Sequence, residues 1–147
     1  MLALGLLPVL AFAGSPVTVE LHGGLFQDFA PSAFHLQHVL LPLLRNMGLR
    51  TELEIARSGY VPHGDGILRL IVHPLTESFR NFVKEESGPV TRIWGIALSS
   101  HLEERQVNRR MAESAQAVLG ESGYQADIEI RHDTESPQRG AAGALCR

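Results

Sequence analysis

The chain has 147 residues, 44% of them hydrophobic and 20% charged, and its formal net charge at pH 7 is -3. This composition is typical of a globular chain of one domain or two small ones, and the slightly acidic charge excludes the broad basic surface of a dedicated nucleic-acid-binding domain. A lone cysteine, Cys146, excludes an internal disulfide, and no apolar run reaches the roughly 18 residues that a membrane-spanning helix needs.

The first 14 residues, MLALGLLPVLAFAG, admit two interpretations. Ala11-Phe12-Ala13 resembles a signal-peptidase site that follows a short apolar region. However, no Lys or Arg precedes that region, as a secretory signal normally requires. The alternative is a buried helix, followed by a strand that opens after Pro16. The pattern alone leaves both interpretations open.

The next elements alternate between strand and helix. Residues 17–22 alternate apolar and polar side chains, which predicts a half-buried strand that ends at Gly23-Gly24. Residues 32–47 have helical spacing, and Gly48 suits the position just after a helix end. Pro42 falls inside this run and lacks a backbone N–H, so we expect a kink or a locally broken turn there.

Two further alternating runs, residues 50–56 and 67–73, flank a connector rich in Gly, Pro and Asp at residues 58–66. Two such runs around a turn-rich connector predict an antiparallel hairpin with a long loop. The order of helices and strands favours an α+β layer, with the helices on one face of the sheet.

The second half begins with a polar segment at residues 76–88. We then expect strands at residues 90–98 and 126–131 and, between them, an amphipathic helix at residues 102–119. A turn-rich stretch follows, and residues 144–147 begin a further strand. The expected apolar face of the helix comprises Val107, Met111, Ala115 and Val118.

Four short motifs follow one another along the first half of the chain. They are Gly23-Gly24, FAPS at residues 29–32, LLPLLRNMG at residues 40–48 and SGYVPHGDG at residues 58–66. Each motif is weak alone, but their order and spacing together resemble the middle of RNA 3'-terminal phosphate cyclases. Residues 88–110 are also similar to the small domain inserted in that family.

The resemblance implies an α+β fold in two parts. Residues 1–75 would form a partial layer of the cyclase core, similar to the C-terminal fold of a translation initiation factor. Residues 76–137 would form the inserted small α/β domain, and residues 138–147 would return towards the core. Because such a partial core leaves apolar faces uncovered, we expect self-association.

The resemblance also implies an activity: ATP-dependent conversion of an RNA 3'-phosphate to a 2',3'-cyclic phosphate, with ATP and Mg²⁺ as cofactors, RNA 3'-phosphate ends as partners, no membrane and a cytoplasmic location. In that reaction a histidine accepts AMP from ATP and passes it to the RNA phosphate, and the neighbouring 2'-hydroxyl then displaces it. The family's nucleophilic histidine lies in its C-terminal third, and none of the seven histidines here matches it. We therefore expect no catalytic residue and no cyclisation by this chain alone. The alternative is a non-catalytic relative that binds RNA or ribosome-assembly partners.

One candidate site residue follows from the resemblance. Pro31 occupies a position that contacts the nucleotide in the family; alternatively, Pro31 only begins a helix, where proline is favoured at the first position. A glutamine that also contacts the nucleotide in the family is replaced by Leu4. Asp65 stands where the family has glycine, and it adds negative charge where RNA phosphates would approach.

Several histidines suggest other chemistry. His35 and His38 lie one helical turn apart, and His22 precedes the glycine turn. Without a cysteine or paired carboxylates beside them, they favour structural positions over a zinc site, so we expect no metal ligand. His63 and Asp65 could form an acid–base pair, but so close together in a loop they are typical of solvated turn residues.

Overall fold

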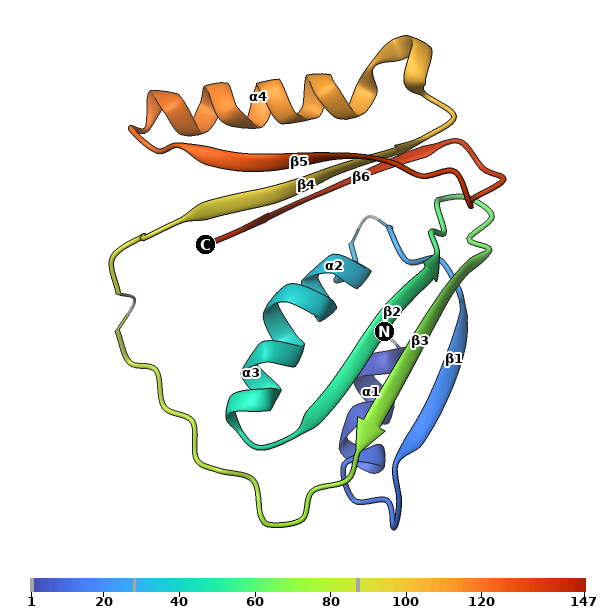
Figure 1. Cartoon of the computed structure of the whole chain (residues 1–147), viewed down its shortest axis with the longest axis vertical. Helices are drawn as coiled ribbons and strands as arrows, with labels where there is room; N and C mark the ends of the chain where they lie inside the picture. The colour runs from blue at the N-terminus through green and yellow to red at the C-terminus, as the bar shows by residue number, and fades with distance from the viewer. Residues whose placement is uncertain (1, 28, 87) are drawn as a thin grey trace. The chain divides into compact units, whose positions relative to one another are not determined.

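The structure, a computed structural model, describes residues 2–27, 29–86 and 88–147. It separates into two compact units, Met1–Glu85 and Glu86–Arg147. Within the described residues each unit has one three-stranded sheet with helices packed on it (Figure 1). The fold is therefore α+β, as the sequence predicts.

The first unit is built on an antiparallel sheet with the strand order β1-β3-β2. Its strands are β1 (Val17–Gly23), β2 (Arg50–Arg57) and β3 (Gly66–His73). The predicted hairpin is confirmed, because β2 and β3 pair directly. Alternation places one side of each strand in the core, where Leu70 and Val72 are fully buried.

The N-terminal segment forms a helix of the first unit. Helix α1 (Leu2–Leu10) contacts β3. Ala3, Leu7 and Ala11 recur at every fourth position and are all buried. The backbone N–H of Leu75 donates to the carbonyl of Ala11 at 2.8 Å. Of the two interpretations of this segment, the structure contains the packed helix.

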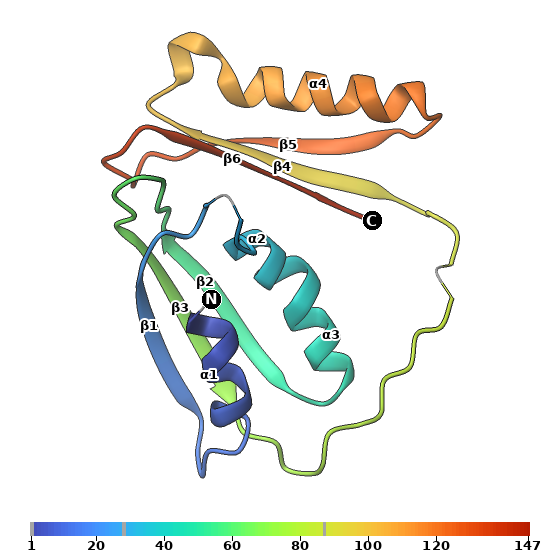
Figure 2. The same cartoon turned by 180° about the vertical axis from the view of Figure 1, so that it is seen from behind.

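A second helical run covers the same face of the sheet as α1 (Figure 2). It contains the irregularity that Pro42 predicts, in the form of a wide turn in which the N–H of Leu41 donates to the carbonyl of Leu36. Gly48 follows the run with a φ of 103°, a conformation that favours glycine at a helix end. The run consists of α2 (Ala33–His35), a π-helical turn (Leu36–Leu40) and α3 (Leu41–Asn46).

The second unit contains a parallel strand–helix–strand motif. Strand β4 (Ile93–Ser100) leads into α4 (Val107–Glu121), and β5 (Ala126–His132) returns parallel to β4. A third strand, β6 (Gly140–Cys146), pairs antiparallel with the other side of β4. Helix α4 covers one face of this sheet in both ribbon views (Figures 1 and 2).

Two boundaries differ from those expected. The units divide between Glu85 and Glu86, not after residue 75. Residues 138–147, expected to return towards the first part, instead provide β6 beside β4. The start of β6 was not recognised as a strand because its run of Gly and Ala gives no apolar alternation, although such small side chains allow a strand. The assignment of the two units to a cyclase core and an inserted domain stays a prediction.

The expected inner face of helix α4 is confirmed in part, since Val107, Met111 and Ala115 are half-buried. Asn108 and Ala112 are buried, whereas Val118 is 62% exposed. The Asn108 amide donates to the carbonyl of Arg131 at 2.9 Å, so the first turn of α4 is tied to the end of β5. This polar anchor sets the rotation of the helix, and a search for apolar periodicity cannot detect it.

Candidate functional site

A pocket of about 430 Å³ lies in the first unit, between α1, the end of β1 and the start of the second helical run. Its walls are mainly apolar because both helical segments turn leucines towards the inner face of the sheet. A pocket of this size and character suits a flat organic group better than a free ion. The leucines that line it are Leu2, Leu4, Leu21, Leu36, Leu40 and Leu68.

The structure brings together the two positions that the sequence singled out for nucleotide contact. Pro31 and Leu4 both line this pocket. Pro31 is exposed, so its ring is accessible from the pocket. Leu4 is half-buried, and its side chain extends the apolar wall at the position where the resemblance expects an amide.

Pro31 does not begin a helix. The N-cap of α2 is Ser32, whose hydroxyl accepts a hydrogen bond from the backbone N–H of His35 at 3.2 Å. Pro31 therefore precedes the cap and lies outside the helix. The explanation of this proline as a residue of the first helical position is wrong, because Ser32 occupies the capping position.

A junction of glycines supports the loop that carries Pro31. A side chain at Gly59 would place a Cβ 2.5 Å from both the carbonyl oxygen of Gly23 and the backbone nitrogen of Gly66. Only glycine allows the backbones to approach so closely. The Gly23-Gly24 turn and the connector at residues 58–66, which are separate motifs in the sequence, therefore meet in the structure.

The Pro31 loop is also tied down by hydrogen bonds and ring contacts. Leu25 links the two sides, since its N–H donates to the Gly59 carbonyl and its carbonyl accepts from the N–H of Ala33, both at 3.0 Å. The Phe26 ring lies between those of Phe34 and Tyr60, with centroid distances of 4.8 and 5.7 Å. These contacts hold Pro31 at a fixed place beside the pocket.

Asp65 adopts the conformation that glycine favours. Its φ is 53°, in the left-handed region, which is consistent with a position that resembles a glycine of the family. Its carbonyl accepts a hydrogen bond from Arg57 Nε at 2.7 Å, which stabilises the connector. His63 and Asp65 are both exposed.

Two of the histidines noted in the sequence, His22 and His35, line the pocket and are exposed. The side chain of His22 contacts Glu20, with 2.8 Å between Nε2 and Oε1. The main cause that lowers the pKa of the Glu20 carboxyl is its hydrogen bond from Arg69, and His22 adds to the effect. The sequence did not predict that His22 and His35 would share a pocket, because only the sheet register and the helix packing bring them together.

No group of three or more His, Cys, Asp or Glu side chains that could hold a metal ion occurs among the described residues. Among the same residues, no helix is both long and apolar enough to cross a membrane.

Comparison with known proteins gives one family over nearly the whole chain. A sequence model described as RNA 3'-terminal phosphate cyclase matches residues 1–138, including the N-terminal segment that forms α1. The RNA 3'-terminal phosphate cyclase of Methylococcus capsulatus is 37% identical over 123 residues, which are 84% of this chain and 34% of that protein. The enzyme of that name from Hyperthermus butylicus is 35% identical over 91% of this chain and 37% of its own length. The RNA 3'-terminal phosphate cyclase of Drosophila melanogaster is 32% identical over 95% of this chain and 39% of its own length. The chain thus spans about a third of the length of the curated relatives it matches.

Proposed function

Because this chain belongs to the RNA 3'-terminal phosphate cyclase family, we propose that its first unit provides part of the nucleotide-binding site of an ATP-dependent RNA 3'-phosphate cyclase. The observation that carries the proposal is the shared pocket of Pro31 and Leu4, the two positions that the resemblance places against the nucleotide. Its apolar leucine walls suit a purine ring, and the exposed Pro31 ring offers a flat face for the base.

The reaction that we propose for the complete protein uses ATP, with Mg²⁺ as counter-ion, to convert an RNA 3'-phosphate into a 2',3'-cyclic phosphate in the cytoplasm. ATP supplies AMP, which makes the terminal phosphate reactive, and the adjacent 2'-hydroxyl is already close enough to close the ring. The nucleophilic histidine would come from the family's C-terminal third. In this scheme the contribution of residues 1–147 is to bind and orient the nucleotide, and these residues by themselves do not perform the reaction.

A second candidate function is a non-catalytic relative that binds RNA or ribosome-assembly partners. Leu4 favours it, because an apolar side chain lines the pocket where the resemblance expects a glutamine amide. A pocket without that amide would bind a base less selectively, since an apolar wall forms no hydrogen bonds that distinguish one base from another. The two functions differ in whether the pocket retains affinity for ATP.

We further propose that the chain associates with itself through apolar surface near its N-terminus. Leu2, Val9 and Phe12 are 65%, 69% and 72% exposed, and they lie on α1 and in the turn after it. Several large apolar side chains exposed on one short segment favour association.

The proposed function is tested by calorimetric titration of the purified chain with ATP. We expect saturable binding that the Pro31→Ala variant weakens, because the ring face is removed. The matched control is Pro89→Ala, which alters an exposed proline of the other unit. Absence of ATP binding, or equal effects of the two variants, would contradict the proposal and favour the second candidate.

A further inference from the structure

The loop between β1 and α2 is closed by a hydrogen bond, and Phe29 lies midway between the two residues that form it. The N–H of Ala33 donates to the carbonyl of Leu25 at 3.0 Å. Both residues line the pocket that contains Pro31 and Leu4. Phe29 precedes Pro31 by two residues, which span at most about 7 Å. The backbone of Phe29 therefore lies beside the proposed nucleotide site.

The side chain of Phe29 is uncovered. It is 108% exposed, so no described residue shields its ring from solvent. The two neighbouring phenylalanines differ from it, since Phe26 is 7% and Phe34 is 3% exposed and their rings pack against each other. This part of the chain thus buries two aromatic rings and presents the third to solvent.

The backbone of Phe29 has an unfavourable conformation. Its φ is 64°, in the left-handed region, where a bulky side chain is an outlier. Such conformations persist where the surroundings hold them, and they cluster at ligand sites. Here the Leu25–Ala33 hydrogen bond and the Ser32 cap of α2 hold the end of the loop. A single exposed apolar residue is ordinary, but one that also has a strained backbone points to a function.

The surroundings of Phe29 favour a flat ligand over a protein partner. A protein interface needs a contiguous apolar area of several hundred Å². Phe29 has no such area around it along the loop, where Gln27 is exposed and polar and Ala30 is small. One uncovered ring instead offers a single flat face. Aromatic side chains exposed in this way bind unpaired nucleobases by stacking on them.

We propose that Phe29 stacks on an unpaired base of an RNA strand. This inference rests on the proposed function, which supplies RNA as the partner and places a nucleotide beside Pro31. It adds a base-binding residue outside the nucleotide pocket, because Phe29 does not belong to the lining of that pocket.

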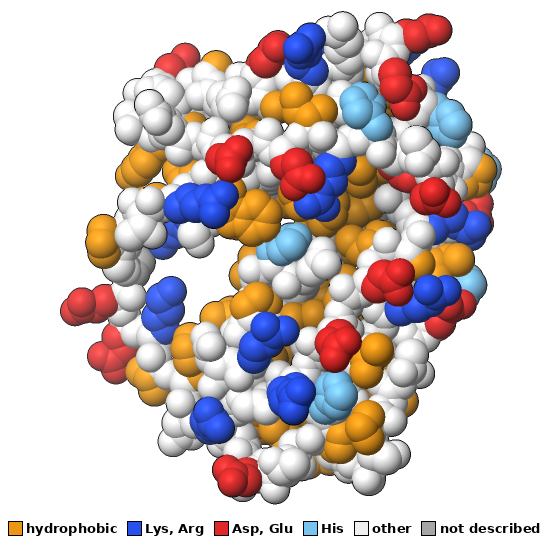
Figure 3. Space-filling view, viewed as in Figure 1, with side chains coloured by type: hydrophobic (Ala, Val, Ile, Leu, Met, Phe, Trp, Pro, Cys, Tyr) orange, Lys and Arg blue, Asp and Glu red, His pale blue; other side chains and the backbone are white. Residues whose placement is uncertain are grey.

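The charges of the chain make stacking the main source of affinity in this proposal. The formal net charge is -3. On the face that Figure 3 draws, acidic and basic side chains are interspersed and do not gather into a broad basic surface. Because few phosphates would be neutralised, RNA binding should depend only weakly on salt. Raising the salt from about 50 to 200 mM should weaken binding by no more than about threefold, the change for a single phosphate contact.

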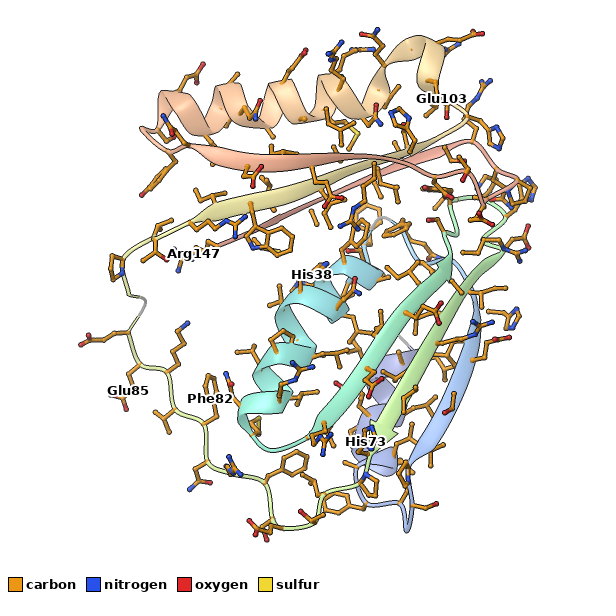
Figure 4. All side chains as sticks on the ribbon, viewed as in Figure 1. His38, His73, Phe82, Glu85, Glu103 and Arg147 are labelled. Carbon is orange, nitrogen blue, oxygen red and sulfur yellow. The ribbon has the colours of Figure 1, made fainter. Side chains whose placement is uncertain are left out.

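The test is a titration of a short single-stranded RNA that ends in a 3'-phosphate with the full chain, without ATP, followed by the fluorescence anisotropy of a 5' label. We expect saturable binding that Phe29→Ala weakens at least about fivefold, because one stacking surface is lost. Phe29→Tyr keeps the ring and should bind as the native chain does. The matched control is Phe82→Ala, which removes an exposed phenylalanine from the segment between β3 and β4 (Figure 4) and should leave RNA binding unchanged.

Two further arms separate stacking from other kinds of contact. Phe29→Leu keeps an apolar side chain without a flat ring, so it should bind RNA as weakly as Phe29→Ala does. A strand with the same phosphates but without bases should bind the native chain as weakly as RNA binds the alanine variant. Native-like affinity in either arm would overturn the proposal.

Phe29→Asn separates loss of binding from loss of the fold. Asparagine tolerates the left-handed conformation, and the uncovered ring has no packing to lose. This variant should therefore melt at or above the temperature of the native chain while its affinity for RNA falls. A native chain that binds no RNA, or one whose affinity equals that of Phe29→Ala, would contradict the proposal.

Calorimetric titration with ATP is a separate measurement, so the two proposals can fail independently. RNA binding that depends on Phe29, in a chain without affinity for ATP, would support the stacking role and contradict the nucleotide pocket. Affinity for ATP without RNA binding that depends on Phe29 would support the nucleotide pocket and overturn the stacking role.

Discussion

Pro31 and Leu4 face one pocket, although Pro31 belongs to the loop before α2 and Leu4 to helix α1. The loop packs against the junction of Gly23, Gly59 and Gly66. The helix is held by Ala3 and Leu7, which are buried in the core. Pro31 and Leu4 therefore line the pocket from supports that are themselves packed. A change at either position alters the pocket without disturbing the sheet.

Leu4→Gln should strengthen ATP binding. The new amide lies in the pocket wall, where it can form a hydrogen bond to the base, and one such bond contributes about 0.5–1.5 kcal/mol, or roughly a 2- to 12-fold gain in affinity. Calorimetric titration with ATP measures the effect. Val9→Gln makes a similar change at a residue of α1 that is 69% exposed and does not line the pocket, so it should leave affinity unchanged. Equal affinities of the Leu4→Gln variant and the native chain would contradict the assignment of this wall to the base.

Gly59→Ala should destabilise the first unit by at least about 2 kcal/mol, because the new Cβ would overlap backbone atoms that cannot move independently. Its ideal position is 2.5 Å from the Gly23 carbonyl oxygen. Gly14→Ala is the matched control, since no heavy atom lies within 4 Å of its added Cβ. Urea denaturation followed by circular dichroism compares the two. Similar unfolding midpoints would show that the connector and the Gly23-Gly24 turn do not meet as described.

Leu7→Ala should reduce the free energy of unfolding by about 2–4 kcal/mol, the usual cost of emptying a buried leucine site. Leu7 is 4% exposed in the middle of α1. Val9→Ala, on the exposed side of the helix, should change stability by less than about 0.5 kcal/mol. If α1 were instead a leader segment without a place in the core, both variants would unfold together with the native chain.

The segment between β3 and β4 should be the first site of proteolysis. Phe79 packs edge-on against Phe12, and the N–H of Arg80 donates to the carbonyl of Met47 at 2.9 Å, so the start of the segment is attached to the first unit. Residues 81–86 are all exposed and have no helix or strand; Phe82 and Glu85 mark them in Figure 4. The chain's one lysine, Lys84, lies among them. Exposed segments without regular structure are the preferred sites of cleavage.

A lysine-specific protease should therefore cut the native chain once, into residues 1–84 and 85–147, as measured by mass spectrometry. Lys84→Arg is the control and should resist. A native chain that stays intact while the urea-denatured chain is cut would show that Lys84 is protected by structure.

Sedimentation velocity tests the proposed association. The native chain should sediment as a dimer or larger species, because apolar side chains on α1 and in the turn after it remain uncovered. Replacing Val9 and Phe12 with Gln should shift the distribution towards monomer. A compact native monomer at all concentrations would rule out association through this surface.

The elements that could be predicted are those whose pattern is set by local burial. Strands β1, β2 and β3 alternate cleanly because one face of each is covered, and Pro42 marks the irregular turn because it lacks an N–H. Only the end of strand β6 could be found, from residue 144 on, since the Gly and Ala residues at its start give no contrast between its faces.

The candidate site could be predicted only in part. Pro31 and Leu4 were found through the order of the family motifs, and the structure adds that they share a pocket. The buried Asn108 escaped notice because its role depends on a carbonyl of β5.

The central claim is that residues 1–147 supply nucleotide-binding structure of the cyclase family without its covalent chemistry. Incubation of the purified chain with Mg²⁺ and ATP labelled in the α-phosphate, followed by denaturing electrophoresis, tests it most directly. We expect no acid-labile label on the protein, because no histidine of this chain matches the family's nucleophile. A labelled band that disappears when one of the seven histidines is replaced would contradict the account.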